Sequence, residues 1–124
     1  MTPLPHDPDL LVRAFCEAVP RADLDEILGF MADDAVYHNI PMEPSVGHEA
    51  IRTFLEGFLG MASSLDFVIH RQLAVGNLVM NERTDTMTIG DKTISLPVAG
   101  AFEIANGKIA AWRDYFDMGQ FLNG

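Results

Sequence analysis

The chain has 124 residues, of which 48% are hydrophobic and 21% are charged, a composition typical of one folded domain rather than of a disordered chain. Its 18 acidic and 8 basic residues give a formal net charge of −10, which repels phosphate backbones and anionic membrane surfaces. The apolar stretches are too short to span a bilayer and no leader segment is recognisable, so we expect a cytoplasmic single domain over residues 1–124, with neither nucleic-acid nor membrane partners.

The first half of the chain has the pattern of three helices and one strand. Apolar side chains recur at helical spacing in three segments, a proline suits the first turn of the first segment, and an aspartate can cap the second. A short strand pattern that ends in a proline lies between the second and third helices. The expected elements are helices at 7–19 and 21–31, an acidic turn at 32–34, a strand at 35–41, and a turn leading into a helix at 43–61.

The second half consists of strand patterns joined by short turns. Glycine-containing turn signals separate runs that are rich in β-branched and aromatic residues. Strands that follow one another through short turns pair antiparallel, and helices followed by a strongly bent antiparallel sheet make an α+β architecture. The expected strands are two within residues 66–89, with a break near 75–77, and then 93–105 and 109–118.

The last of these strands carries a charged residue on an apolar face. In the sequence WRDYFD, alternation along a strand places Trp112, Asp114 and Phe116 on the same side. A bare carboxylate between two large apolar rings costs several kcal/mol unless it is hydrogen-bonded, paired or protonated. Asp114 is therefore expected to have partners from elsewhere in the chain.

Two other strand segments bring polar side chains to faces that are otherwise apolar. In VMNERTDTM, Arg83 and Asp85 share a face, and in AVYHNIP, Tyr37 and Asn39 share a face. If these faces converge inside one curved sheet, the four side chains form a polar cluster with Asp114 at the bottom of an apolar cavity. Structural alternatives are a buried ion pair, a core tyrosine and a turn-forming asparagine.

Three stretches of the sequence resemble the limonene-1,2-epoxide hydrolase family. They are VYHNIPMEPSVGHEAI, NERTD and LPVAGAFEIANGKIAAWRDYFD, and the likeness covers roughly residues 22–119. This family lies within a larger group of cone-shaped α+β domains related to nuclear transport factor 2, the SnoaL-like proteins and the ketosteroid isomerases. The resemblance implies N-terminal helices packed on a strongly curved, mixed but mostly antiparallel sheet that encloses a pocket.

The resemblance also implies a reaction and a role for each residue of the polar cluster. The reaction is one-step hydrolysis of an apolar epoxide, of the limonene-1,2-epoxide or cycloalkene-oxide type, to a vicinal diol, with water as the nucleophile. Asp114 matches the family's general base, and Tyr37 and Asn39 match the residues that hold the water. Asp85 matches the general acid, and Arg83 lies between the two carboxylates. No cofactor is implied, and the expected assembly is a homodimer.

The pocket wall is expected to be apolar and free of metal ligands. None of the four histidines has a second histidine at ligand spacing, so we expect neither a metal nor a catalytic histidine. The single cysteine, Cys16, fits the apolar face of a helix and is expected to be structural. The residues expected to contact substrate are Trp112, Phe116, Met87, Phe58, Leu96 and Val98.

Two other function classes fit the same residues. A ketosteroid-isomerase-like or polyketide-cyclase-like enzyme would use Asp114 to move a proton next to a carbonyl, and a non-catalytic binding module would keep the pocket without turnover. Arg83 argues against the isomerase, because such a pocket more often uses neutral oxyanion donors.

Overall fold

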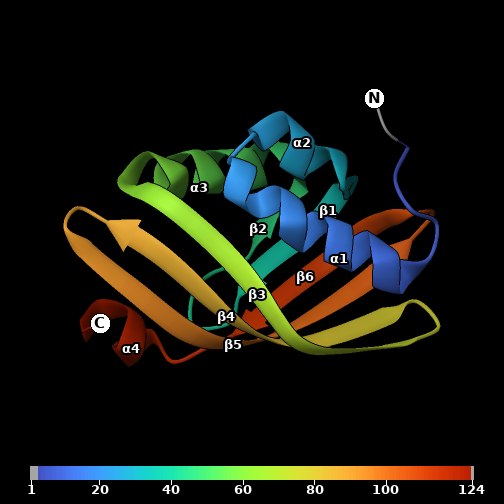
Figure 1. The fold of residues 1–124 in the computed structure, drawn as a ribbon. Coiled ribbons are helices and arrows are strands. Elements are labelled where there is room, and N and C mark those ends of the chain that lie inside the picture. The colour runs from blue at the N-terminus through green and yellow to red at the C-terminus, as the bar shows by residue number, and fades with distance from the viewer. Residues whose placement is uncertain (1–2, 124) are drawn as a thin grey trace.

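The structure, a computed structural model, describes residues 3–123 and confirms the predicted α+β class. Three helices precede most of the sheet in the chain (Figure 1). The helices are α1 (Pro8–Ala18), a short 3-10 helix (Val19–Arg21), α2 (Leu24–Gly29), α3 (Gly47–Met61) and α4 (Met118–Asn123). The strands are β1 (Met31–Asn39), β2 (Ser45–Val46), β3 (Ala62–Val75), β4 (Leu78–Ile89), β5 (Lys92–Ala105) and β6 (Lys108–Tyr115). No helix within residues 3–123 is long and apolar enough to cross a membrane.

Side-chain caps explain where the first two helices begin. Asp7 accepts a hydrogen bond from the backbone N–H of Leu10 at 3.1 Å, and Pro8 occupies the first turn of α1, where a backbone N–H has no intrahelical partner. Asp23 caps α2 by accepting from the backbone N–H of Glu26 at 3.2 Å. The caps fix the first residue of each helix, and the buried residues Leu11, Phe15, Ile27 and Leu28 mark the helix faces that are packed in the core.

The six strands form one mixed sheet in the order β2-β1-β6-β5-β4-β3. Strands β3 to β6 pair antiparallel with their neighbours in the sequence, as predicted, whereas β1 pairs parallel with β6. Register shifts interrupt the β3–β4 and β5–β6 pairs, and such irregularities increase strand twist. The sheet curves beneath α1, α2 and α3, which lie together on one of its faces (Figure 1).

The core between the helices and the sheet has two parts. Next to α1, Phe15 packs edge to face on Trp112 with ring centroids 4.9 Å apart, and Phe102 stacks on the same indole at 6.1 Å. This part is filled by aromatic and aliphatic side chains. The second part surrounds a cavity, and its buried members are Met87, Ile94, Leu96 and Val98.

Strand β1 begins earlier than the sequence predicted. Helix α2 ends at Gly29 instead of reaching residue 31, and residues 32–34 belong to the strand instead of forming a turn. The prediction was wrong because the pairing partner is distant in the sequence. Met31 is in register with Ile109 of β6, and the Ile109 N–H donates to the Phe30 carbonyl at 2.8 Å.

Smaller differences concern the ends of other elements. Strand β3 begins at Ala62, and the segment Ser45–Val46, expected to be a turn, pairs with β1 as the short strand β2. The last strand ends at Tyr115, and the unpredicted helix α4 follows it. Asp117 caps this helix by accepting from a backbone N–H two residues later at 2.8 Å. A helix of this length has too few turns for a periodic apolar signal.

Candidate active site

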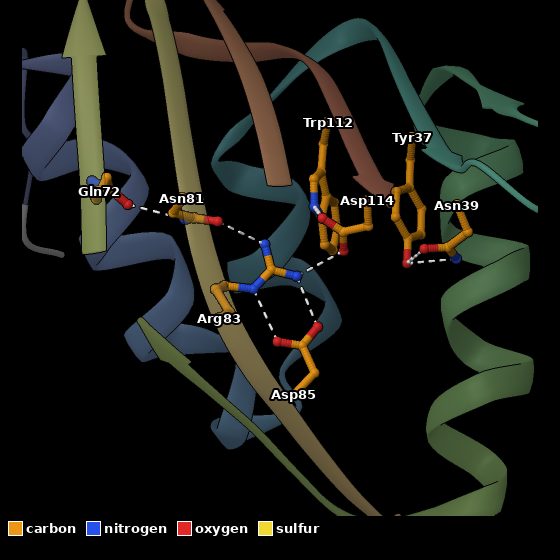
Figure 2. Close-up of polar contacts among 8 residues, drawn as sticks. All are labelled: Tyr37, Asn39, Gln72, Asn81, Arg83, Asp85, Trp112 and Asp114. Atoms are coloured by element: carbon orange, nitrogen blue, oxygen red, sulfur yellow. Dashed lines mark hydrogen bonds and ion pairs between the residues drawn. The ribbon is translucent and has the colours of Figure 1, made fainter. Parts of the chain in front are cut away.

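A cavity of about 210 Å³ lies between α3, the C-terminal segment and the inner face of the sheet. Most of its wall is apolar. The polar side chains among the described lining residues are Tyr37, Asn39, Asp85 and Asp114, and they converge at the same end of the cavity (Figure 2). An apolar cavity with a few convergent polar groups is the usual form of a small-molecule site.

Arg83 joins the two carboxylates at this polar end (Figure 2). Its Nε and Nη2 donate to Oδ1 and Oδ2 of Asp85 at 2.9 and 2.7 Å, and Nη2 also donates to Oδ2 of Asp114 at 2.9 Å. All three side chains are buried, and the guanidinium carbon lies 4.6 Å from the centroid of the Phe67 ring. The planar fork of an arginine is suited to holding two carboxylates at once.

Arg83 reaches Asp114 by passing over a glycine. Gly100 of β5 is in register with Asn81 of β4 on one side and with Asp114 of β6 on the other. A Cβ atom at Gly100 would overlap Nη1 of Arg83 and lie 2.8 Å from Oδ1 of Asn81. Glycine weakens a strand interior and often marks a close approach by another group, which here is the guanidinium. The ion-pair geometry therefore requires a glycine at this position.

Asp114 has a second hydrogen-bond donor on its own strand. The indole N–H of Trp112 donates to Oδ1 of Asp114 at 2.8 Å. Tyr37 stacks on this indole with ring centroids 4.0 Å apart, and its hydroxyl accepts a hydrogen bond from Nδ2 of Asn39 at 3.0 Å. Because Asn39 is in register with Asp114 on the neighbouring parallel strand, the phenol, the amide and the carboxylate lie close together along the cavity (Figure 2).

Burial and ion pairing control the protonation of these groups. Burial raises the pKa of Asp85 to about 6, opposed by the hydrogen bonds and charge of Arg83 and assisted by the charge of Asp114. Burial alone would lower the pKa of Arg83, but Asp114 and Asp85 raise it above its ordinary value, so the guanidinium stays charged. Burial also raises the pKa of Tyr37, which keeps the phenol neutral. Two carboxyl groups that share one cation can supply both a proton donor and a proton acceptor.

The structure brings the five predicted polar residues to one site. One residue predicted for the pocket wall, Trp112, does not line the cavity. Arg83 lies behind the carboxylates rather than in the lining. Trp112 is not among the lining residues of this cavity either, and its indole N–H donates a hydrogen bond to Asp114. The predicted wall residues that do line the cavity are Phe58, Met87, Leu96, Val98 and Phe116.

Some residues of the site were not selected from the sequence. Asn81, which lies on the same strand face as Arg83, accepts a hydrogen bond from Nη1 at 3.1 Å, and strand alternation alone was a sufficient signal for it. Gly100 was detectable as a glycine inside an apolar strand pattern. Gln72 was not detectable, because its contact with Asn81 depends on the pairing of β3 with β4. Unpredicted apolar lining residues include Met42, Phe54, Leu65, Phe67, Met118 and Phe121.

Fold and site together define a class of protein, a curved α+β domain whose apolar cavity contains a buried pair of carboxyl groups held by one arginine. The family model described as the limonene-1,2-epoxide hydrolase catalytic domain matches residues 7–124. The chain belongs to this family, as the three quoted sequence stretches predicted.

Two relatives from Mycobacterium tuberculosis are similar to this chain at the level of sequence. The epoxide hydrolase EphG of strain ATCC 25618 / H37Rv is 35% identical over 113 residues, which cover 91% of this chain and 75% of that protein. The solved structure of an M. tuberculosis LEH-like epoxide hydrolase is also 35% identical, with a TM-score of 0.80 over 90% of this chain and 84% of that one.

More distant structures share the fold. A SnoaL-like polyketide cyclase from Shewanella denitrificans OS-217, described as putative in its published name, has a TM-score of 0.85 with 15% sequence identity, over 94% of each chain. Because one fold can host unrelated activities, this likeness concerns the backbone and not the chemistry.

Proposed function

We propose that this protein, as a single domain, hydrolyses an apolar epoxide to a vicinal diol in one step, with water as the nucleophile. The observation that carries the proposal is the pair of buried carboxyl groups on one guanidinium at the end of an apolar cavity. Opening an epoxide requires a nucleophile at carbon and a proton for the departing oxygen, and a general base and a general acid can supply them together. Membership of the family supports the same reaction.

Asp114 is the proposed general base. Its two oxygens accept hydrogen bonds from Trp112 and Arg83, and each keeps lone-pair capacity for a water molecule. The hydroxyl of Tyr37 and the amide of Asn39 lie beside it along the cavity. We propose that these three groups hold the attacking water, and that Asp114 takes its proton as the water oxygen bonds to the epoxide carbon.

Asp85 is the proposed general acid. It lines the cavity, and a pKa of about 6 keeps part of it protonated near neutral pH. Its proton passes to the epoxide oxygen as the carbon–oxygen bond breaks, and the carboxylate that remains is stabilised by Arg83. Asp114 then holds the proton taken from water, and proton exchange with solvent restores the starting state of both groups.

The experiment that tests this function is diol formation from limonene-1,2-epoxide and cyclohexene oxide by the purified protein. Apolar rings of this kind suit a wall that includes Met87, Leu96 and Phe116. Turnover of either epoxide supports the proposal. A folded protein that opens no apolar epoxide but isomerises a ketosteroid favours the proton-transfer alternative, and one that binds these molecules without turnover favours a binding module.

The pH dependence of kcat/KM should report the protonation of Asp85. A general acid must carry its proton, so kcat/KM should fall about tenfold per pH unit above a pKa of about 6. The raised pKa also means that the contribution of Asp85 to stability is fully present below the unfolded-state value of 3.8 and is lost as the pH rises through about 6. Rates corrected for spontaneous hydrolysis check the first expectation. A kcat/KM that rises above pH 6 contradicts the assignment of Asp85.

We propose that the protein forms a homodimer through the outer face of the β3–β4 hairpin. Leu73 and Val75 on β3 are 78% and 80% exposed, and they are in register with the exposed residues Met80 and Leu78 on β4. A contiguous exposed apolar patch is typical of an interface. Sedimentation should give twice the mass of one chain for the wild type and the mass of one chain for Val75→Asp. A wild type that is monomeric at micromolar concentration contradicts the assembly.

A further inference from the structure

A chain of side-chain hydrogen bonds runs from Arg83 to helix α1. Nη1 of Arg83 donates to Oδ1 of Asn81 at 3.1 Å, and Nδ2 of Asn81 donates to Oε1 of Gln72 at 3.0 Å (Figure 2). Nε2 of Gln72 then donates to the side-chain Oδ1 and to the backbone carbonyl of Asp9, at 2.8 and 3.0 Å. These hydrogen bonds therefore connect the ion pairs of the site to α1 through β4 and β3.

The groups at the two ends of this hydrogen-bond series determine how the side-chain amides of Asn81 and Gln72 are oriented. The guanidinium of Arg83 only donates, and the carboxylate and carbonyl of Asp9 only accept. Gln72 must therefore turn its NH2 group toward Asp9, and Asn81 must turn its oxygen toward Arg83. Hydrogen bonds from Gln72 and from Arg13 lower the pKa of Asp9, which keeps its carboxylate ionised. The negative charge of Asp9 thus orients Gln72, and Gln72 in turn orients the amide oxygen of Asn81 toward the guanidinium.

The contact between Asn81 and Arg83 lies in a part of the core that leaves little room for water. Asn81 is 5% exposed and Arg83 is 1% exposed. Gly100 makes the contact possible, because a Cβ atom there would lie within 2.8 Å of Oδ1 of Asn81 and overlap Nη1 of Arg83. Nη1 is the guanidinium nitrogen that contacts neither carboxylate in the described structure, whereas Nε and Nη2 bind Asp85 and Asp114. Asn81 therefore anchors the remaining corner of the guanidinium.

We propose that Asp9, Gln72 and Asn81 are positioning residues for Arg83, which form a relay from α1 that holds the guanidinium in the orientation needed to bind Asp85 and Asp114 together. This inference rests on the proposed function, because it explains how the acid and the base of that reaction keep their relative geometry. None of the three relay residues is among the lining residues of the cavity. Loss of the relay should therefore lower kcat more than it weakens substrate binding.

The first test removes the amide of Gln72. Gln72→Met keeps the length of a half-buried side chain, so the protein should fold, and kcat for epoxide hydrolysis should fall about tenfold, the rate equivalent of one hydrogen bond. KM should stay within about twofold, since substrate contacts are unchanged. The control is Ser64→Ala, which removes a 2.9 Å hydrogen bond to Thr88 across the same two strands and should leave kcat unchanged. A kcat of Gln72→Met equal to that of the wild type or of Ser64→Ala overturns the relay.

The second test uses the direction of the hydrogen bonds. Gln72→Glu keeps an acceptor for Asn81 but replaces the donor toward Asp9 with a second carboxylate. Repulsion between the two carboxylates should separate position 72 from α1, so kcat should fall. Adding Asp9→Asn restores a donor toward position 72, and kcat of the double variant should return to within about threefold of the wild type. A double variant that remains as slow as Gln72→Glu overturns the proposed direction of the relay.

The third test needs no turnover and separates the relay from the proposed reaction. Asn81→Asp places a carboxylate beside Nη1, so that Arg83 contacts three carboxyl groups instead of two. The added negative charge disfavours the ionised form of Asp85. Carbon NMR of the carboxyl groups should then show the pKa of Asp85 rising from about 6 by about one unit. An unchanged pKa overturns the relay, whereas an inactive wild type overturns the reaction alone. Other titratable or charged groups that act on this part of the core are Tyr37 from β1, Cys16 and Arg13 from α1, and Asp66 from β3.

Discussion

Asp114→Asn should lower kcat for epoxide hydrolysis by about 10³-fold or more, the upper part of the range for losing a general base. The amide oxygen still accepts a hydrogen bond from Trp112 or Arg83, so the pocket should keep its shape. An amide oxygen does not take a proton from water near neutral pH, so the water is no longer activated. Arg83 should remain paired with Asp85, which it binds at 2.7 Å in the wild type. Initial rates of diol formation at saturating epoxide measure the effect.

The matched control is Asp117→Asn, three residues further along the chain. Asp117 is exposed, is not among the lining residues of the cavity, and caps α4 through an oxygen that an asparagine also provides. Its kcat should stay within about twofold of the wild type. If Asp114→Asn keeps more than a tenth of wild-type kcat, or if both variants lose the same amount, Asp114 is not the base.

Arg83→Met should abolish hydrolysis and lower the free energy of unfolding by about 3–5 kcal/mol, the cost of removing one partner from a buried ion pair. The carboxyl side chains of Asp85 and Asp114 are 7% and 5% exposed, so they would be left buried without a cation. Protonation relieves that cost because it removes the negative charge. The loss of stability should therefore be smaller at about pH 5 than at about pH 8, as measured by urea unfolding.

Arg113→Met is the control for this prediction. Arg113 pairs with Glu103 at 2.6 Å, but the two side chains are 30% and 54% exposed, and an exposed pair of this kind contributes about 0–1 kcal/mol. Activity should stay close to that of the wild type. An Arg83→Met protein as stable as Arg113→Met contradicts the claim that Arg83 stabilises the two buried carboxyl groups of Asp85 and Asp114.

Strand alternation was sufficient to predict which residues share a face. The spacing in WRDYFD and NERTD places Asp114, Arg83 and Asp85 on inward faces whatever the exact ends of the strands, because a period of two does not depend on where a strand begins. The burial of all three side chains agrees with that prediction. The α+β class followed in the same way from apolar spacing that changes from helical to alternating.

Other features depend on contacts between distant parts of the chain. The start of β1 at Met31 is determined by parallel pairing with β6, which no local signal at the acidic segment 32–34 reveals. Gln72 belongs to the site because β3 pairs with β4 in one particular register. Tyr37 of β1, which lines the cavity, stacks on Trp112 of β6, which does not line it. Side-chain packing and strand register decide these features, and no local pattern in the sequence reveals them.

The chemistry proposed for this protein depends on the polar cluster and not on the fold. A structure described as a SnoaL-like polyketide cyclase matches the backbone with a TM-score of 0.85 at 15% identity, so the backbone alone does not distinguish a hydrolase from a cyclase. The proposal for a hydrolase therefore rests on the buried guanidinium between two carboxyl groups, which in the proposed reaction stabilises one carboxylate while the other holds a proton.

The most direct test of this account is the source of the oxygen atom that enters the diol. A single turnover in water enriched in oxygen-18, with enzyme in excess over epoxide, should give diol that carries one labelled oxygen per molecule, because water activated by Asp114 attacks the ring. An attack by an aspartate oxygen would instead form an enzyme ester, whose hydrolysis leaves the label on the protein. Unlabelled diol in that first turnover would contradict direct hydrolysis by water.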